Sequence, residues 1–266
     1  MEGKDYEARR ICLEGVENAR QLGGIVCADG RRVRKNVLIR TGALKNATDQ
    51  DVRLLTDEFR VTRIFDFRMR GEHETAPDRA VPGAENVWIE VLRRSAVRVD
   101  VPETWRTDGT RMLIEYAIQL MPTLYRRILL SPEGQAGYAR FFREVLAQTD
   151  GAILWHCTQG KDRAGIAAVL MLMALGADEE IALDDFDLSN IAYAAYTAEM
   201  TRAATAYGYS ESDTAAVRGL TGVNREYMRE AIAAIKAEYG SVAAYIRNQL
   251  GVTDAQIEIL RDRYLE

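Results

Sequence analysis

The chain of 266 residues has few of the residues that build metal sites, disulfide scaffolds or nucleic-acid surfaces. It has two histidines, His73 and His156, so a zinc site would need an unusual set of ligands. Its three cysteines cannot all pair with one another and are too few for a disulfide scaffold. The 40 acidic residues outnumber the 35 basic ones, and the net charge of −5 argues against a nucleic-acid partner.

Long apolar runs and targeting signals are also missing. The amino terminus has no apolar segment typical of a secretory signal, and the longest uncharged stretch, 164–177, is shorter than the roughly 20 residues of a membrane helix. We therefore expect a soluble, cytoplasmic protein without a membrane span, while export without a visible signal stays open. No low-complexity segment, proline-rich linker or repeat marks a domain boundary, so we expect a single domain over residues 1–266.

Periodicity and turn signals predict strands alternating with helices, followed by helices alone. A hairpin around Asp29-Gly30 would join strands at 22–26 and 33–39. Further strands are predicted at 61–67, 86–91 and 152–155, and helices after the N-cap Thr48 and over 137–146 and 163–175. Beyond Arg163 the whole pattern is helical, with helix-end signals at Gly176, Ser241 and Thr253. This order indicates an α/β fold with appended helices.

The strongest chemical signal lies between the predicted strand 152–155 and the predicted helix 163–175. Cys157 and Arg163 are separated by five residues, which lets the backbone curl into a ring of inward-pointing N–H groups at the positive end of the helix. Such a ring suits a phosphate dianion, and the planar fork of Arg163 can hold two phosphate oxygens. Cys157 would lie at the bottom of the ring as a thiolate and could attack phosphorus.

The other residues of this segment fit the same purpose. The expected phosphate-binding residues are Thr158, Gln159, Gly160, Lys161, Ala164 and Gly165. Gly160 and Gly165 allow tight curvature and close packing, and we expect His156 to anchor the loop by hydrogen bonding rather than to act as a base. A lone cysteine is usually a core residue and a lone arginine is usually solvated. That interpretation leaves the run Gly160–Arg163 unexplained.

The segment His156-Cys157-x-x-Gly160-Lys161-Asp162-Arg163-x-Gly165 resembles the signature of the cysteine-dependent protein tyrosine phosphatases. It is most similar to the bacterial members with a Gly-Lys-Asp-Arg loop, which include secreted virulence phosphatases. Weaker similarities occur in the family's order at 18–24, 38–44, 64–68 with Glu72 and Pro77-Asp78, 239–241 and 250–251. The resemblance implies a cysteine-phosphatase fold, in which a mostly parallel central sheet is flanked by helices, with a helical lid at about 181–220.

The resemblance also implies a reaction. We expect hydrolysis of phosphotyrosine, and also of phosphoserine or phosphothreonine, through a cysteinyl-phosphate, without a metal or other cofactor. The substrate would be a phosphorylated protein or a phosphoinositide, and inorganic phosphate would be a product. At position 164 the family signature has a hydroxyl that helps the sulfur leave, so Ala164 is expected to slow hydrolysis of the phosphoenzyme. Two alternatives stay open: a phosphoinositide phosphatase with the same mechanism, and a phosphate-binding module with low turnover.

Three carboxylates are candidates for the general acid that protonates the leaving group. Asp66 ends a strand expected beside that of Cys157, but it could equally pin the loop or Arg68. Asp162 lies within the loop, and Asp100 lies in a loop where a solvated role is the simpler interpretation. The sequence does not choose among them.

Several other residues have two interpretations. Lys161 is either an additional phosphate contact, which the resemblance links to phosphoinositides, or a solvated lysine. Arg20 and Arg40 lie either near the site or in salt bridges elsewhere. Cys12 and Cys27 are expected to be buried thiols, and a reversible disulfide to Cys157 is possible chemistry.

Overall fold

The computed structural model describes residues 2–98 and 108–266, and its centre is a five-stranded sheet with the order β1-β2-β5-β3-β4. The strands are β1 (Arg20–Gln21), β2 (Leu38–Thr41), β3 (Val61–Asp66), β4 (Glu85–Trp88) and β5 (Ala152–His156). β2, β5, β3 and β4 are parallel, and β1 pairs antiparallel with β2 at one edge. The expected α/β architecture with a mostly parallel central sheet is confirmed.

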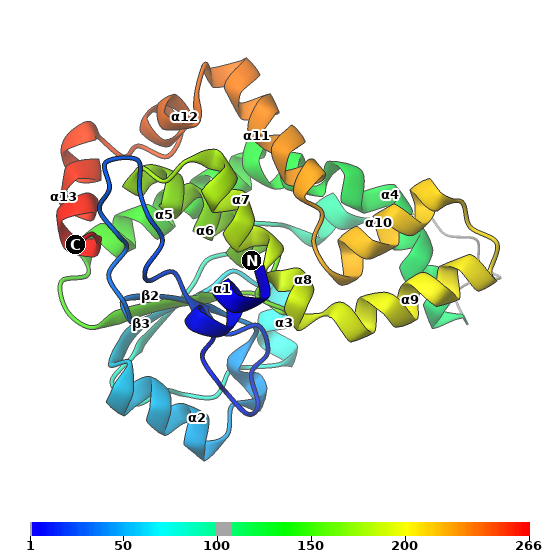
Figure 1. Cartoon of the computed structure of the whole chain (residues 1–266), viewed down its shortest axis with the longest axis horizontal. Helices are drawn as coiled ribbons and strands as arrows, with labels where there is room; N and C mark the ends of the chain where they lie inside the picture. The colour runs from blue at the N-terminus through cyan, green and yellow to red at the C-terminus, as the bar shows by residue number, and fades with distance from the viewer. Residues whose placement is uncertain (1, 99–107) are drawn as a thin grey trace.

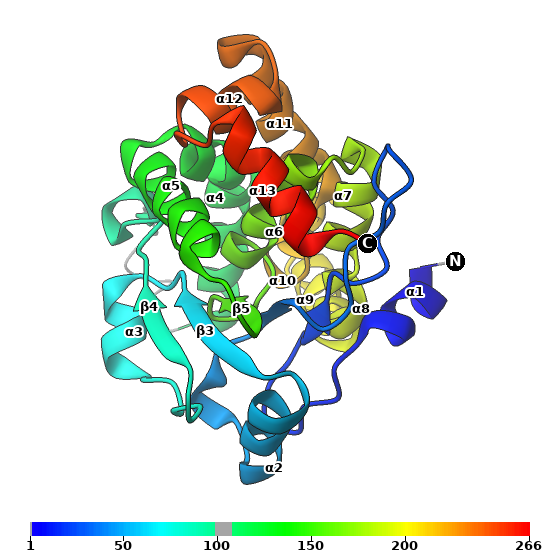
Figure 2. The same ribbon diagram turned by 90° about the vertical axis from the view of Figure 1, so that its left-hand side faces the viewer.

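Helices cover both faces of this sheet (Figures 1 and 2). One face carries α2 (Asp49–Arg53, continued by a π-helical turn over Leu54–Glu58), and α1 (Glu2–Arg9) and α3 (Arg70–Thr75) lie at the periphery. On the other side of the sheet lie α4 (Gly109–Leu130), α5 (Pro132–Ala147), α6 (Arg163–Leu175), α7 (Glu179–Asp187), α11 (Arg225–Tyr239), α12 (Val242–Asn248) and α13 (Asp254–Tyr264). Among the described residues no helix has the length and apolar character needed to cross a membrane.

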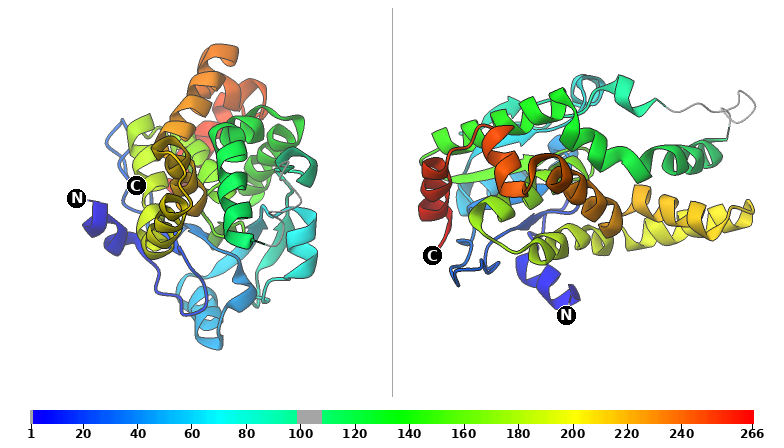
Figure 3. Two further views of the ribbon diagram at one scale, coloured as in Figure 1. Left: turned by 90° about the vertical axis from the view of Figure 1, so that its right-hand side faces the viewer. Right: turned by 90° about the horizontal axis from the view of Figure 1, so that it is seen from above.

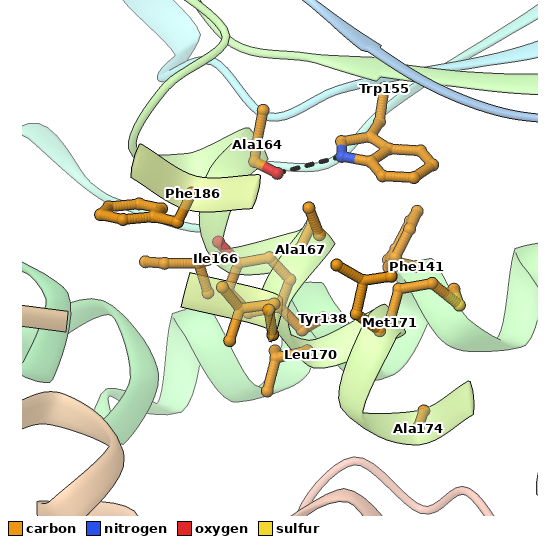
Figure 4. Packing of buried hydrophobic residues seen from close by; sticks show 14 of the residues in the cluster. Tyr138, Phe141, Trp155, Ala164, Ile166, Ala167, Leu170, Met171, Ala174 and Phe186 are labelled. Atoms are coloured by element: carbon orange, nitrogen blue, oxygen red, sulfur yellow. Dashed lines mark hydrogen bonds between the residues drawn. The ribbon is translucent and has the colours of Figure 1, made fainter. Parts of the chain in front are cut away.

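The alternation of side chains along β5 explains why the protein has a core on each side of the sheet. Ile153 and Trp155 belong to the large cluster on the side of α4, α5 and α6, whereas Ala152 and Leu154 belong to the smaller cluster on the side of α2. Phe141 of α5 packs edge-on against Trp155, with ring centroids 5.7 Å apart. The indole nitrogen of Trp155 donates to the carbonyl oxygen of Ala164 at 3.0 Å (Figure 4). This bond joins the end of β5 to the first turn of α6.

A helical arm extends from the body beyond the sheet (Figure 3, right). It consists of the first half of α4 together with α9 (Ala194–Ala206) and α10 (Glu211–Thr221), which follow the short helix α8 (Ser189–Ala192). Its own small core is made by Ile114 and Ala117 of α4, Met200 and Ala204 of α9, and Ala216 and Val217 of α10. The start of the expected lid, α7, packs in the main core instead, so the part that projects begins after it.

The predicted signals at the ends of several helices are confirmed. α6 spans Arg163–Leu175 as predicted, and Gly176 ends it with a left-handed φ of 94°. Thr48 caps α2, and Thr253 forms a capping box with Gln256.

Two expectations for the rest of the chain are wrong, and three helices were missed. The turn at Asp29-Gly30 exists, but its arms form only an isolated bridge between Val26 and Arg32, and residues 32–34 bond to the C-terminal residues 264–266 instead of forming a strand of the hairpin. Helices α1, α3 and α4 were not predicted. Cys12 is exposed rather than buried, while Cys27 lies in the main core, and all three cysteines are free thiols.

Candidate active site

The predicted strand–loop–helix unit around Cys157 is present at the carboxyl ends of the parallel strands. Cys157 follows β5 directly, and Arg163 is the first residue of α6. Both side chains are buried, at 2% and 9% exposure. Ligands of open parallel sheets bind at this edge, beyond the carboxyl ends of the strands.

Every carbonyl oxygen from Cys157 to Lys161 has a hydrogen-bond donor on the outside of the loop. His156 Nδ1 lies 3.2 Å from the Cys157 oxygen, and the backbone N–H of Ala43 donates to the Thr158 oxygen at 3.1 Å. The Gln159 oxygen accepts from the hydroxyl of Tyr193 at 2.7 Å and from Nδ2 of Asn18 at 3.1 Å.

One arginine binds the remaining two carbonyls. Nη2 of Arg40 donates to the oxygens of Gly160 at 2.8 Å and Lys161 at 3.1 Å. In a planar trans peptide the N–H group points away from the carbonyl oxygen. Fixing these carbonyls outward therefore aims the N–H groups of residues 158–162 into the ring, as a phosphate site requires.

Two glycines make this tight loop possible. Gly160 has a positive φ of 66°, and a Cβ atom there would lie 2.2 Å from the carbonyl oxygen of Thr41. A Cβ atom at Gly165 would lie 2.8 Å from the ring of Phe186 and 2.9 Å from Nη2 of Arg40. Gly165 thus lets α6 approach the arginine that binds the loop carbonyls.

Glu72 of α3 orients Arg163 through a bidentate ion pair. Nη1 of Arg163 donates to Oε2 of Glu72 at 2.6 Å, and Nη2 donates to Oε1 at 3.0 Å. Burial alone would raise the pKa of Glu72, but its bonds to Arg163 outweigh burial and lower it. Glu72 was part of the weak sequence similarity but had no assigned role, because α3 is 91 residues away from Arg163 in the chain.

The three candidate acids lie in different surroundings. Asp66 is 4% exposed, and its oxygens accept hydrogen bonds from Nε, Nη2 and the backbone N–H of Arg68. Burial would raise the pKa of Asp66, but these bonds lower it to about 2. Asp162 is partly exposed and accepts from the hydroxyl of Tyr125 at 2.8 Å. Asp100 lies outside the described residues.

The tyrosine phosphatase family matches residues 11–266. The chain belongs to this family. A Cupriavidus necator protein named as a tyrosine-protein phosphatase is 32% identical over 262 residues, which cover 96% of this chain and 88% of the relative. This chain is therefore a phosphatase.

Two more distant relatives are also named as phosphatases. A tyrosine-protein phosphatase of Nostoc commune is 26% identical, over 86% of this chain and 74% of the relative. The triple specificity protein phosphatase PtpB of Mycobacterium tuberculosis is 29% identical over 58% of each chain. The crystal structure of PTPMT1 in complex with PI(5)P aligns over 74% of this chain and 96% of the other, with 10% identity and a TM-score of 0.29. That score is too low to support conclusions about this phosphatase.

Arg20 and Arg40 belong to a buried charge cluster of the phosphatase. Both are completely buried, and they surround the carboxylate of Asp185 on α7 together with Arg9. Nη1 of Arg40 donates to Asp185 Oδ2 at 2.8 Å, while Nη2 donates to the carbonyl oxygen of Gly160 in the loop. Both arginines therefore form buried salt bridges, and Arg40 also contacts the loop that follows β5.

The oxygens of Asp66 and Asp78 and a ring nitrogen of His156 lie within 4.8 Å of one another. Arg68 donates hydrogen bonds to both carboxylates, and His156 Nε2 lies 3.2 Å from Asp78 Oδ2. We therefore assign this cluster to a salt-bridge network beneath the loop.

His156 makes the stability of the phosphatase depend on pH. Burial would lower its pKa, but Asp78 and Asp66 outweigh burial and raise it. The protonated ring therefore stabilises the fold fully below its unfolded pKa of about 6.5, and this contribution is lost as the pH rises through the folded pKa. We expect the free energy of unfolding to fall above pH ~6.5, by at most about 1.4 kcal/mol per pH unit. Urea unfolding at a series of pH values measures this dependence. We expect the free energy of unfolding to change less with pH in His156→Gln and Asp78→Asn than in the wild type. A pH dependence equal to that of the wild type would contradict the assignment.

Proposed function

We propose that this phosphatase hydrolyses phosphotyrosine in proteins through a cysteinyl-phosphate intermediate, with Cys157 as the nucleophile and Arg163 as the phosphate clamp. The observation that carries the proposal is that hydrogen bonds hold all five carbonyl groups from Cys157 to Lys161 outward from the loop. It supports a ring of N–H donors around a phosphoryl group, at the amino end of α6, where negative charge is stabilised. Thr158, Gln159, Gly160, Lys161, Ala164 and Gly165 form the frame of this ring.

The reaction has two steps. The thiolate of Cys157 forms a bond to phosphorus while the bond from phosphorus to the phenolic oxygen breaks, and a general acid protonates the departing oxygen. Water then attacks phosphorus and gives a proton to the carboxylate of the general acid, while the P–S bond breaks, the Cys157 thiolate is restored and inorganic phosphate leaves. Arg163, oriented by Glu72, binds two of the phosphoryl oxygens in both steps.

Asp162 is our choice for the general acid. It is partly exposed at the loop, and the hydroxyl of Tyr125 orients it. The contacts of Asp66 support the other interpretation considered for it, in which the carboxylate positions Arg68. A carboxylate that accepts several bonds from a buried guanidinium is a poor proton donor near neutral pH.

Trapping the phosphoenzyme tests this mechanism. The wild-type protein is mixed with a phosphotyrosine peptide, quenched in acid within milliseconds and examined by mass spectrometry. We expect one phosphoryl adduct on Cys157 and none in Cys157→Ser. Phosphate release that is equally fast in both proteins would overturn the proposal, and binding of the peptide without release from either would favour the phosphate-binding module.

The substrate range needs a separate panel. One relative is named a triple specificity phosphatase, so phosphoserine, phosphothreonine and a soluble phosphoinositide are tested beside phosphotyrosine. We expect the highest Cys157-dependent kcat/KM with phosphotyrosine. A higher value with the phosphoinositide would favour the lipid phosphatase.

Ala164 is expected to limit the second step. Its side chain is fully buried at the start of α6, so no hydroxyl from this position can donate to the departing sulfur. A hydrogen bond to a charged group contributes about 1.5–3 kcal/mol, so we expect Ala164→Thr to hydrolyse the phosphoenzyme about tenfold faster or more. Single-turnover kinetics measure this rate directly. Unchanged hydrolysis in both Ala164→Thr and the smaller Ala164→Ser would show that another group activates the sulfur.

A further inference from the structure

Lys161 belongs to the phosphate loop, yet its side chain lies 1% exposed in the protein interior. Nζ donates to the carbonyl oxygen of Gly222 at 2.7 Å and also to that of Leu220. The nearest carboxylate oxygen, Oδ2 of Asp162, is 3.5 Å away. Of the two interpretations of Lys161, the solvated lysine is therefore wrong.

The acceptors of Lys161 identify what its charge stabilises. α10 ends at Thr221, so Leu220 and Gly222 flank its last residue. The last carbonyls of a helix lack partners within the helix and carry its negative dipole end, where a cation is stabilising. A buried ammonium group also needs such partners, because it has lost its hydration. The lysine thus serves as a C-terminal cap for α10, contributed by a distant loop.

The helical arm has a second contact with the same loop. The hydroxyl of Tyr193, which directly precedes α9, donates to the Gln159 oxygen at 2.7 Å. The chain leaves the loop at Tyr193, runs out along α9, returns along α10 and meets the loop again at Lys161 (Figures 1 and 3). Both ends of this helical hairpin are therefore fastened to neighbouring parts of the phosphate loop.

We propose that Lys161 is a positioning residue, which fastens the base of α10 to the phosphate loop and couples the helical arm to the conformation of the loop. This inference rests on the proposed role of the loop as the phosphate site. The amine is directed to α10, so Lys161 does not set a preference for phosphoinositides over phosphoproteins. Its substitution changes how firmly the arm is held, and turnover of both substrate classes changes together.

Gly222 offers a variant on the other side of this contact. A Cβ atom there would lie 2.3 Å from Oδ1 of Asn190, which accepts a hydrogen bond from the N–H of Val223 at 2.8 Å. Gly222→Ala therefore displaces the carbonyls that Lys161 binds, without altering any residue of the phosphate loop. If Lys161 acts through α10, the two substitutions have the same consequence.

Hydrogen exchange of the full chain tests the coupling directly. We expect amides in α9 and α10 to exchange about tenfold faster in Lys161→Met and in Gly222→Ala than in the wild type, while those of β5 and α11 keep their rates. The matched control is Lys236→Met, which removes an exposed lysine paired with Glu179 and is expected to match the wild type. Wild-type exchange of α10 in both Lys161→Met and Gly222→Ala would overturn the proposal.

Kinetics separate a positioning role from contact with substrate. We expect Lys161→Met to lower kcat/KM for a phosphotyrosine peptide and for a soluble phosphoinositide by the same factor. A selective loss of phosphoinositide hydrolysis, combined with wild-type exchange in α10, would show that Lys161 binds substrate. The exchange experiment requires no turnover, so its outcome stands apart from failure of the proposed catalytic mechanism.

Discussion

Arg163→Lys is expected to reduce kcat/KM for phosphotyrosine peptides by about 10³-fold, since loss of one preorganised donor at a developing charge costs about 10²–10³ in rate. Arginine presents two N–H groups in a fixed plane, whereas lysine offers a flexible point charge. In the structure Glu72 fixes that plane by accepting from both Nη1 and Nη2. A lysine at position 163 could neither bind both Glu72 oxygens in this way nor present a planar fork to phosphate.

Steady-state kinetics and thermal unfolding check this prediction together. The fold should survive, because the lysine can still form an ion pair with Glu72. The matched control is Arg140→Lys, an exposed change on α5 that should leave kcat/KM within about twofold of the wild type. A loss smaller than tenfold in Arg163→Lys would mean that the loop N–H groups alone stabilise the transition state.

The strand, loop and helix of the candidate site could be predicted from the sequence because their signals are local. A short apolar run predicted β5. The spacing of Cys157 and Arg163, together with the apolar pattern that follows, predicted the loop and α6. What orients the loop could not be predicted in this way. The donors to its carbonyls, among them Asn18, Ala43 and Tyr193, come from segments far from it in the sequence.

Two misjudged features have the same physical origin. α4 contains Pro122 in its interior, a residue that usually ends a helix, and tertiary packing of its apolar side chains maintains the helix nonetheless. A lysine in such a loop is usually solvated or binds a ligand. Only the position of α10 gives the amine of Lys161 two backbone acceptors. In both cases contacts distant in sequence override a local tendency.

The buried charge cluster around Asp185 shows how such distant contacts connect the fold with the site. Asp185 on α7 is the carboxylate shared by Arg9, Arg20 and Arg40, and Arg40 also binds two loop carbonyls. The arginines come from the N-terminal segment and from β2, so this carboxylate ties the edge of the sheet to the helical face. Burial would raise the pKa of Asp185, but the arginines hold it far below its usual range.

Asp185→Ala is therefore expected to lower the free energy of unfolding by about 3–5 kcal/mol, because it leaves buried guanidinium groups without their counter-ion. Burial together with Arg40 already lowers the pKa of Arg20 to about 9, so removal of the carboxylate should favour the neutral form of Arg20 further. Urea unfolding measures the loss, and Asp185→Asn provides a second variant that retains the size of the side chain. The neighbouring Asp184→Ala removes an exposed partner of Arg225 and should cost at most about 1 kcal/mol. If both Asp185 variants were as stable as Asp184→Ala, the cluster would not hold the sheet edge to α7, and the orientation of Arg40 at the loop would need another cause.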